Sequence, residues 1–165
     1  MRGARPILCA IAFWGLSACA SLRRYETTRD PLSPAEHVAL GNAYLAQGEK
    51  AAAIPQYEAA VQQDRKQIGA WIALGNIAYV AHDWKKARTY FNRALKAAPE
   101  SAAVINNLAM VDLAEGKHLT HARRSLEKAL PTAGRLTPYL LDTLASIDLK
   151  VKHLQESPDK LSRIP

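Results

Sequence analysis

The sequence predicts an all-α protein in which pairs of helices stack into a solenoid. Residues 68–101 carry the first observation, since they read as two amphipathic helical segments joined by a short polar turn. The second observation is that this stretch recurs: residues 40–42, Leu-Gly-Asn, return 34 positions later as residues 74–76. Self-similarity at such a period is typical of helical repeats, whose units stack because one helix pair cannot bury its own apolar side.

Each recurring position has a physical role. A small residue on the first helix would let the two helices of a unit cross closely, and this series is Gly41, Gly75 and Ala109. A large residue on the second helix would fill the gap between neighbouring units, and this series is Tyr57, Phe91 and Leu126. The last of these is offset by 35 positions, which places one inserted residue near residues 118–120.

The spacing of these residues resembles the tetratricopeptide repeat over roughly residues 33–154. The resemblance is carried by Trp71, Leu74, Gly75, Ala87, Phe91, Ala94 and Pro99. It implies a right-handed α-solenoid of three helix pairs plus a C-terminal capping helix. The repeats would span about 34–67, 68–101 and 102–136, and the capping helix 138–154. Ala78 and Ala109 depart from the family pattern, which usually has an aromatic residue and a glycine there.

The first helix is predicted over about 34–47. Ser33 as the N-cap, Pro34 in the first turn and Glu36 three residues after the cap would satisfy backbone N–H groups at the helix start. Gly48 follows the helix and can supply the left-handed residue that ends it. These signals set the boundary between the folded repeats and the preceding segment.

The other helices follow the repeat. The second helix, over about 49–63, contains Pro55 beyond its first turn, so we expect it to be bent or to start late. The next helices are expected over about 67–81, 83–97, 101–115 and 119–130. Thr137 and Pro138 then begin a last helix, which lacks a second-helix partner and would cap the final apolar face. Residues 155–165 are predicted to be a tail.

Residues 1–18 are predicted to be a signal peptide. Arg2 and Arg5 precede an apolar run over residues 7–16. This run is too short for a transmembrane helix, which needs about 20 residues. Residues 16–19, Leu-Ser-Ala-Cys, resemble the bacterial lipobox, which implies that Cys19 is lipidated and becomes the mature N-terminus.

The lipobox resemblance also implies a location. Several acyl chains together make a stable anchor, whereas one chain gives only marginal membrane binding. Ala20, not aspartate, follows Cys19, so the expected site is the outer membrane of a Gram-negative bacterium, facing the periplasm. An ordinary signal peptide cut after Ala20 is the alternative. Residues 19–32 are predicted to form a flexible tether between the anchor and the repeats.

Composition limits the classes of partner and reaction. The chain has 165 residues, enough for one domain, and a formal net charge of +7. We do not expect a nucleic acid partner, because the export signal directs the protein out of the cytoplasm. His118 and His121 could meet on one helical face, as metal ligands do, but the sequence offers no third ligand nearby. We therefore predict a non-enzyme with no catalytic residues, no metal and no cofactor.

The family resemblance implies a protein or peptide partner in a concave groove lined by the first helices. The principal groove residues would be Asn42, Ile72, Asn76, Tyr79, Asn106, Asn107, Met110 and Asp142. Further residues mapped onto the groove are Val38, Leu45, Val80, Leu113, Tyr139, Ser146 and Leu149. Asparagine offers both a donor and an acceptor, so it can pair with a peptide unit of any sequence. The alternative is that asparagine is simply common at this repeat position.

The sequence thus predicts a protein–protein interaction scaffold anchored at the outer membrane. It resembles the small lipoproteins that assist assembly of pili and their secretins. One alternative is an envelope adaptor that recruits peptidoglycan enzymes. An alternative of another class is a metal-dependent hydrolase that uses His118 and His121. The oligomeric state stays open.

Overall fold

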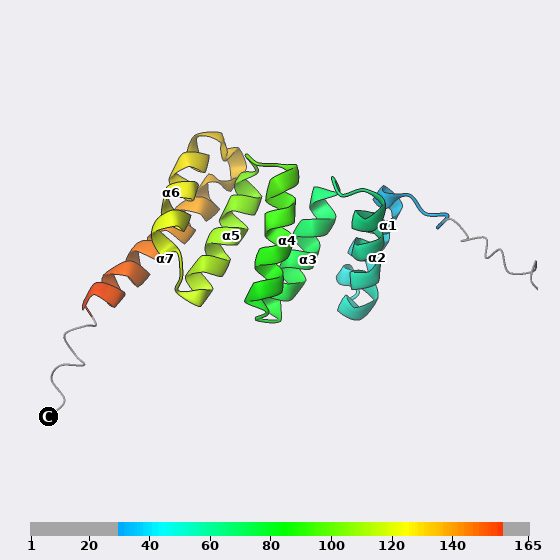
Figure 1. Cartoon of the computed structure of the whole chain (residues 1–165), viewed down its shortest axis with the longest axis horizontal. Helices are drawn as coiled ribbons and strands as arrows, with labels where there is room; N and C mark the ends of the chain where they lie inside the picture. Colours follow the sequence, from blue (N-terminus) through cyan, green and yellow to red (C-terminus); the bar gives the residue numbers. More distant parts are fainter. Residues whose placement is uncertain (1–29, 157–165) are drawn as a thin grey trace, which may run out of the picture. The chain divides into compact units, whose positions relative to one another are not determined.

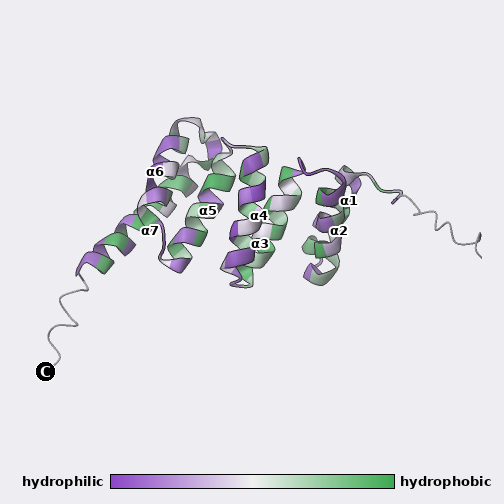
Figure 2. Ribbon diagram, viewed as in Figure 1, coloured by the Kyte–Doolittle hydropathy of each residue, from purple (hydrophilic) through white to green (hydrophobic). Residues whose placement is uncertain are grey.

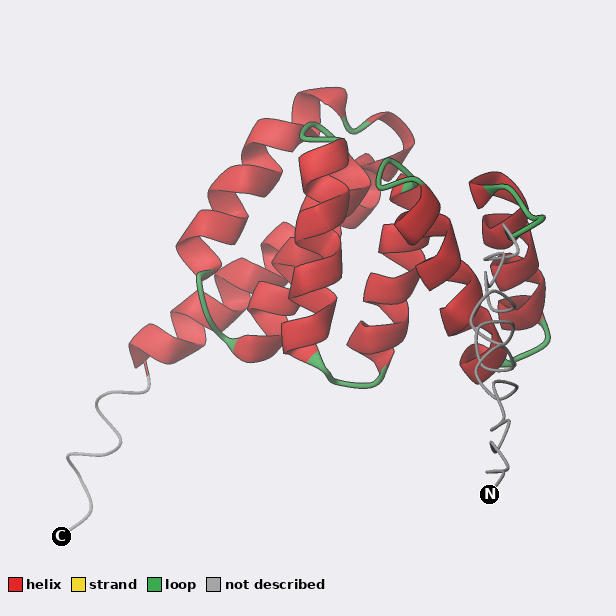
Figure 3. Cartoon of the chain, turned by 45° about the vertical axis from the view of Figure 1, so that its right-hand side comes forward, coloured by secondary structure: helices red, strands yellow, loops and turns green. Residues whose placement is uncertain are grey.

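The computed structural model describes residues 30–156, and in this part of the chain helices are joined by short loops, with no strand (Figures 1 and 3). It contains seven α-helices: α1 Pro34–Ala46, α2 Lys50–Gln63, α3 Ile68–Val80, α4 Trp84–Ala97, α5 Ala102–Glu115, α6 Leu119–Ala129 and α7 Thr137–Glu156. Two short 3-10 helices, Leu130–Thr132 and Gly134–Leu136, connect α6 to α7. The prediction of three helix pairs followed by one further helix is confirmed.

The helices pack mainly against their neighbours in the chain. Each pair, α1–α2, α3–α4 and α5–α6, is in close contact, and α2 contacts α3 as α4 contacts α5. The last helix, α7, packs against both α5 and α6, so it covers the end of the third pair. Figure 2 shows α3 mostly apolar and α4 banded with polar residues, in agreement with the five buried residues of α3 and the three of α4.

Close helix crossings explain the small and large residues of the repeat. A Cβ atom added to Gly75 would lie 2.3 Å from Cε1 of Phe91, whose ring is 1% exposed. Gly41 faces Tyr57 in the same way, at 2.7 Å. The large residue therefore fills the crossing inside its own unit, and Phe91 also belongs to the buried cluster that includes Val104 and Val111 of the next unit. Only glycine leaves room for a ring at this distance from the backbone.

The predicted helix ends are present. Ser33 and Glu36 form a capping box: the Ser33 backbone N–H donates to Oε2 of Glu36 at 2.7 Å, and the Glu36 N–H donates to the Ser33 hydroxyl at 3.4 Å. The side chain of Asp83 accepts a hydrogen bond from the Lys86 N–H at 3.0 Å and caps α4. Gly48 takes a left-handed conformation with φ +80°, as predicted for the residue that ends the first helix.

Two features differ from simple repetition. Pro55 lies inside α2, yet α2 begins at Lys50, so the predicted late start is wrong. The missing N–H of proline is tolerated because the tertiary contacts of α1 and α2 hold the segment helical. The connection from α5 to α6 contains two left-handed residues, Gly116 and His118, at the place where the sequence shows its one-residue insertion.

The predictions for the chain ends fall on residues that the structure does not describe. The signal peptide at 1–18, Cys19 and residues 20–29 of the tether lie outside the described part, as do residues 157–165 of the tail. Within residues 30–156, none of the helices combines the length and the apolar character that crossing a membrane requires.

Candidate peptide-binding face

The residues predicted to line the groove lie on α1, α3, α5 and α7, and we call their surface the first-helix face. Their exposure varies from helix to helix. Asn42, Asn76 and Asp142 are exposed, Ile72, Tyr79, Asn107 and Met110 are half-buried, and Asn106 is buried. The structure thus keeps most of the predicted residues accessible and removes one of them.

Asn76 and Asn107 bring α3 and α5 together on this face. The Nδ2 group of Asn107 donates to Oδ1 of Asn76 at 3.4 Å, a long hydrogen bond. That bond uses one group of each amide, and an amide offers two donors and an acceptor. The Asn76 amide N–H groups and the Asn107 carbonyl oxygen can therefore meet a partner's backbone. The two side chains form a polar pair that spans neighbouring units.

Asn42 is held differently from its repeat equivalent Asn76. The Tyr57 hydroxyl donates to Oδ1 of Asn42 at 2.7 Å. The second unit has Phe91 at the position of Tyr57, so Asn76 has no such partner there. The Asn42 carbonyl group is engaged inside its own unit, which makes Asn42 a weaker candidate for peptide contact than Asn76. Comparison of Tyr57 with Phe91 in the sequence could have distinguished Asn42 from Asn76.

Asn106 does not lie on the open surface, so its placement in the groove is corrected. Its side chain is 9% exposed, and Nδ2 lies 3.7 Å from the Met110 sulfur. Asn106 lies on the buried side of α5. Ala102, four residues earlier, and Ala109, three residues later, share that side and are also buried. Asn107, one residue on, turns toward the surface.

Tyr79 belongs to an aromatic cluster at the turn between α3 and α4. Its ring meets Trp84 edge-on with centroids 5.1 Å apart, and His82 meets the same indole at 5.0 Å. Val80, next to Tyr79, is 61% exposed. Sequence reasoning missed Trp84, although a tryptophan directly after the turn could have indicated it. The cluster fixes Tyr79 beside an exposed apolar side chain.

A hollow of about 630 Å³ lies on the first-helix face between α5 and α7. Its lining includes Leu113, Ser146 and Leu149, which the repeat pattern had mapped onto the groove. Leu149 and Leu154 are 69% and 53% exposed, so the hollow carries apolar side chains open to solvent. Leu154 was missed because the repeat pattern mapped groove residues only as far as Leu149.

Asp142 lies on the same stripe of α7 as Ser146, one helical turn earlier. It is exposed, and it adds a carboxylate to the face near the hollow. Lys150 and His153 line the hollow itself and supply donors there. This end of the face therefore combines apolar side chains with a few polar groups, as small ligand and peptide sites usually do.

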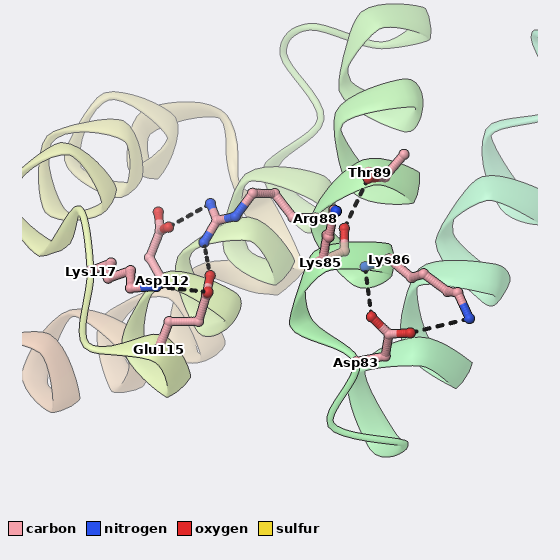
Figure 4. A network of polar contacts seen from close by, with 8 residues as sticks. All are labelled: Asp83, Lys85, Lys86, Arg88, Thr89, Asp112, Glu115 and Lys117. Carbon is pink, nitrogen blue, oxygen red and sulfur yellow. Dashed lines mark hydrogen bonds and ion pairs between the residues drawn. The ribbon is translucent and has the colours of Figure 1, made fainter.

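An ion-pair network fixes the spacing of the second and third units behind the face (Figure 4). Arg88 on α4 pairs through Nη1 with Oδ1 of Asp112 at 2.7 Å and through Nη2 with Glu115, both on α5. Burial alone lowers the pKa of Arg88, but the hydrogen bonds to Glu115 and Asp112 outweigh it and raise that pKa. The hydrogen bond from Arg88 lowers the pKa of Glu115. The guanidinium thus stays charged, and it holds α4 against α5.

His118 and His121, the pair on which the hydrolase alternative depends, are exposed at the start of α6. Within residues 30–156, no group of three or more His, Cys, Asp or Glu side chains is placed to hold a metal ion. In this range the structure brings no third ligand to the two imidazoles.

Comparison with known families gives a consistent match along most of the chain. A family model described as tetratricopeptide repeat matches residues 18–68, 38–102 and 72–135. These overlapping segments extend from the N-terminal part of the chain through the third helix pair.

Two curated proteins are similar to part of the chain. Protein O-mannosyl-transferase TMTC1 of Mus musculus is 41% identical over 63 residues, 38% of this chain and 7% of that protein. The Homo sapiens protein of the same name is 37% identical over 71 residues, 43% of this chain and 8% of that protein. The chain thus spans less than a tenth of the length of these relatives.

Solved structures share the fold. The C-terminal TPR-containing domain of a Plasmodium falciparum FK506-binding protein superposes with a TM-score of 0.60 at 22% identity, over 77% of this chain and 91% of that one. MamA superposes with a TM-score of 0.55 at 18% identity, over 77% of this chain and 83% of that one. At these identities the likeness shows the fold alone.

Proposed function

Because this chain belongs to the tetratricopeptide repeat family, we propose that it is a non-enzymatic scaffold whose first-helix face binds a partner polypeptide. Repeats of this family indicate a protein–protein interaction scaffold. The observation that carries the assignment to this face is the combination of exposed apolar side chains, Val80 and Leu149, with the amide pair Asn76 and Asn107.

The chemistry of the face suits an extended peptide or an amphipathic helix. The amide pair can meet backbone N–H and C=O groups, because one side offers donors and the other an acceptor. The hollow between α5 and α7 can take apolar side chains of the same partner. Polar groups would then set the position of the partner, and apolar burial would supply most of the affinity.

A non-enzymatic role is also supported by the way the relatives match. The similar segments make up 7% and 8% of the two mannosyl-transferases. A likeness confined to so small a part is what shared helical repeats produce, whatever chemistry the remainder performs. We therefore assign the scaffold role to this chain and not the transferase reaction.

Photo-crosslinking from the two sides of the repeats tests the proposal. A photoreactive phenylalanine analogue replaces Val80 on the first-helix face or, as the matched control, Lys86 on α4. Val80 is 61% exposed and Lys86 has a side chain 70% exposed, so both probes reach solvent. We expect a defined partner polypeptide to be crosslinked from position 80 and not from position 86. Equal crosslinking from both positions would refute the assignment of the face.

We propose further that the scaffold is a lipoprotein of the outer membrane, facing the periplasm, with a role in pilus and secretin assembly. Residues 16–19 support the anchor, because they follow a positive start and a short apolar run. The mature Cys19 should incorporate labelled palmitate, and Cys19→Ser should abolish the label while Cys9→Ser leaves it unchanged. Palmitate incorporation that survives Cys19→Ser would overturn the anchor.

Recruitment of peptidoglycan enzymes is the alternative to a role in pilus and secretin assembly, and the identity of the crosslinked partner distinguishes these two roles.

A further inference from the structure

A second hollow, of about 350 Å³, lies between α4, α5 and α6 and shares no lining residue with the hollow on the first-helix face. Its apolar lining includes Ile105 and Leu108 from α5 and Ala122 from α6. Ser125 and His121 of α6 add polar groups to the lining. Folded proteins are packed at nearly crystalline density, so a hollow of this size beside a repeat crossing requires an explanation.

The preceding unit shows what normally fills this space. The repeat equivalents of Ile105 and Ser125 are Trp71 and Tyr90, which lie 34 and 35 positions earlier. Their rings are stacked, with centroids 6.1 Å apart and planes inclined by 27°. Trp71 is 5% exposed, and the Arg93 guanidinium lies 4.9 Å from its ring centroid. Two aromatic rings therefore close the second unit at the place where the third unit is open.

The third unit lacks both rings and has not filled the space by other means. Ile105 and Ser125 are smaller than the residues they replace, and both line the hollow. Leu126 also replaces the ring of Phe91 in the adjoining crossing. An apolar cavity of about 150 Å³ is large enough to bind benzene. The hollow in the third unit is larger than that and partly open to solvent, so an indole or a phenol of a partner can enter it and fits its volume.

The polar groups around the hollow favour a neutral ring with one polar atom. Arg88 and Asp112 line it, but they are paired with each other at 2.7 Å, so their charges largely cancel. The Asn92 amide and the Ser125 hydroxyl also line the hollow, and each can accept a hydrogen bond from an indole N–H or a phenol hydroxyl. A charged ligand would have to compete with the existing ion pair.

We propose that this hollow binds a tryptophan or tyrosine side chain of a partner polypeptide, in the place of the two rings that the third unit lacks. The site is distinct from the first-helix face, because none of the residues that line it belongs to that face. It goes beyond the scaffold function proposed above, since it needs no ligand on the first-helix face. A partner could be held at both sites.

The test uses N-acetyl-tryptophanamide as the probe and N-acetyl-leucinamide as the control ligand. Both are titrated into the full chain in detergent, and backbone amide shifts are followed by NMR. We expect saturable shifts around Ile105 and Ser125 with the tryptophan probe, at a dissociation constant on the order of 1 mM for so small a ligand. The leucine ligand should bind at least tenfold more weakly. Absence of saturable shifts at these positions would overturn the proposal.

Variants of the hollow make the test specific. Ile105→Trp/Ser125→Tyr restores the aromatic pair of the second unit, and it should abolish the saturable shifts without lowering the melting temperature. Arg124→Ala changes an exposed residue of the same helix that does not line the hollow, and it should bind the probe within about twofold of the unchanged chain. If the double variant does not fold, Ser125→Tyr alone serves as the filled form. Unchanged probe binding in a folded, filled variant would contradict the site.

Discussion

Gly75→Ala is expected to lower the free energy of unfolding by about 2–3 kcal/mol, because it overpacks the crossing of α3 and α4. The added Cβ would lie 2.3 Å from the Phe91 ring. That ring is 1% exposed and has little room to move. Urea unfolding followed by circular dichroism measures the change. A loss below about 0.5 kcal/mol, the level usual for surface substitutions, would contradict the close crossing.

The chain offers a control and a rescue for this prediction. Gly69 also lies in α3, but nothing stands within 4 Å of a Cβ added there. Gly69→Ala should therefore be neutral or stabilise by about 0.5–1 kcal/mol. The third unit already combines Ala109 with Leu126 at the same crossing. Gly75→Ala/Phe91→Leu should accordingly be more stable than the sum of the two single losses predicts.

Arg88→Ala is expected to lower the free energy of unfolding by about 3–5 kcal/mol, because it leaves a buried carboxylate without its counter-charge. The side chain of Asp112 is 6% exposed, and Arg88 also pairs with Glu115. The same urea measurement applies. The lost stability should come from the weakened contact between α4 and α5.

The equivalent positions at the other junctions between units supply the controls. Arg123 and Asp148 occupy the equivalent positions at the next junction, 3.4 Å apart, but both are 52% exposed. Arg123→Ala should cost only about 0–1 kcal/mol. The first junction has Ile54 and Ala78 at these positions. Arg88→Ile/Asp112→Ala should therefore regain much of the loss. If Arg88→Ala and Arg123→Ala lower the free energy of unfolding equally, burial of the ion pair does not determine the effect, and the prediction is contradicted.

The fold could be predicted from the sequence because a repeat encodes each contact more than once. The series Gly41, Gly75 and Ala109 and the large residues opposite them indicate the same crossing in each unit. A single violation, such as Pro55, cannot override this signal, since the packing of α1 on α2 outweighs one missing hydrogen bond. Helix starts were predictable where a side chain caps the backbone, as Ser33 does.

The candidate site was less predictable, because the exposure of a side chain can change from one residue of a helix to the next. Asn106 and Asn107 are adjacent and chemically identical, yet only Asn107 reaches its partner on α3. The hydroxyl of Tyr57, one atom more than Phe91 carries, separates the role of Asn42 from that of Asn76. Such differences follow from side-chain geometry and not from the period of the repeat.

The ion-pair network of Arg88 and the hollow in the third unit lie at positions where the repeat units differ in sequence. Aligning the units by sequence would have revealed that Trp71 and Tyr90 become Ile105 and Ser125. Sequence alone does not reveal whether other side chains move in to fill the space. The structure answers that question, because both smaller residues line an open hollow.

The central claim is that the first-helix face holds a partner polypeptide, and crosslinking from position 80 in an Asn76→Ala/Tyr79→Ala background tests it most directly. These substitutions remove the amide donors and the ring beside Val80 but leave the buried helix crossings intact. The account predicts that the crosslinked partner is lost while helicity, measured by circular dichroism, is unchanged. Full crosslinking in the folded double variant would contradict it.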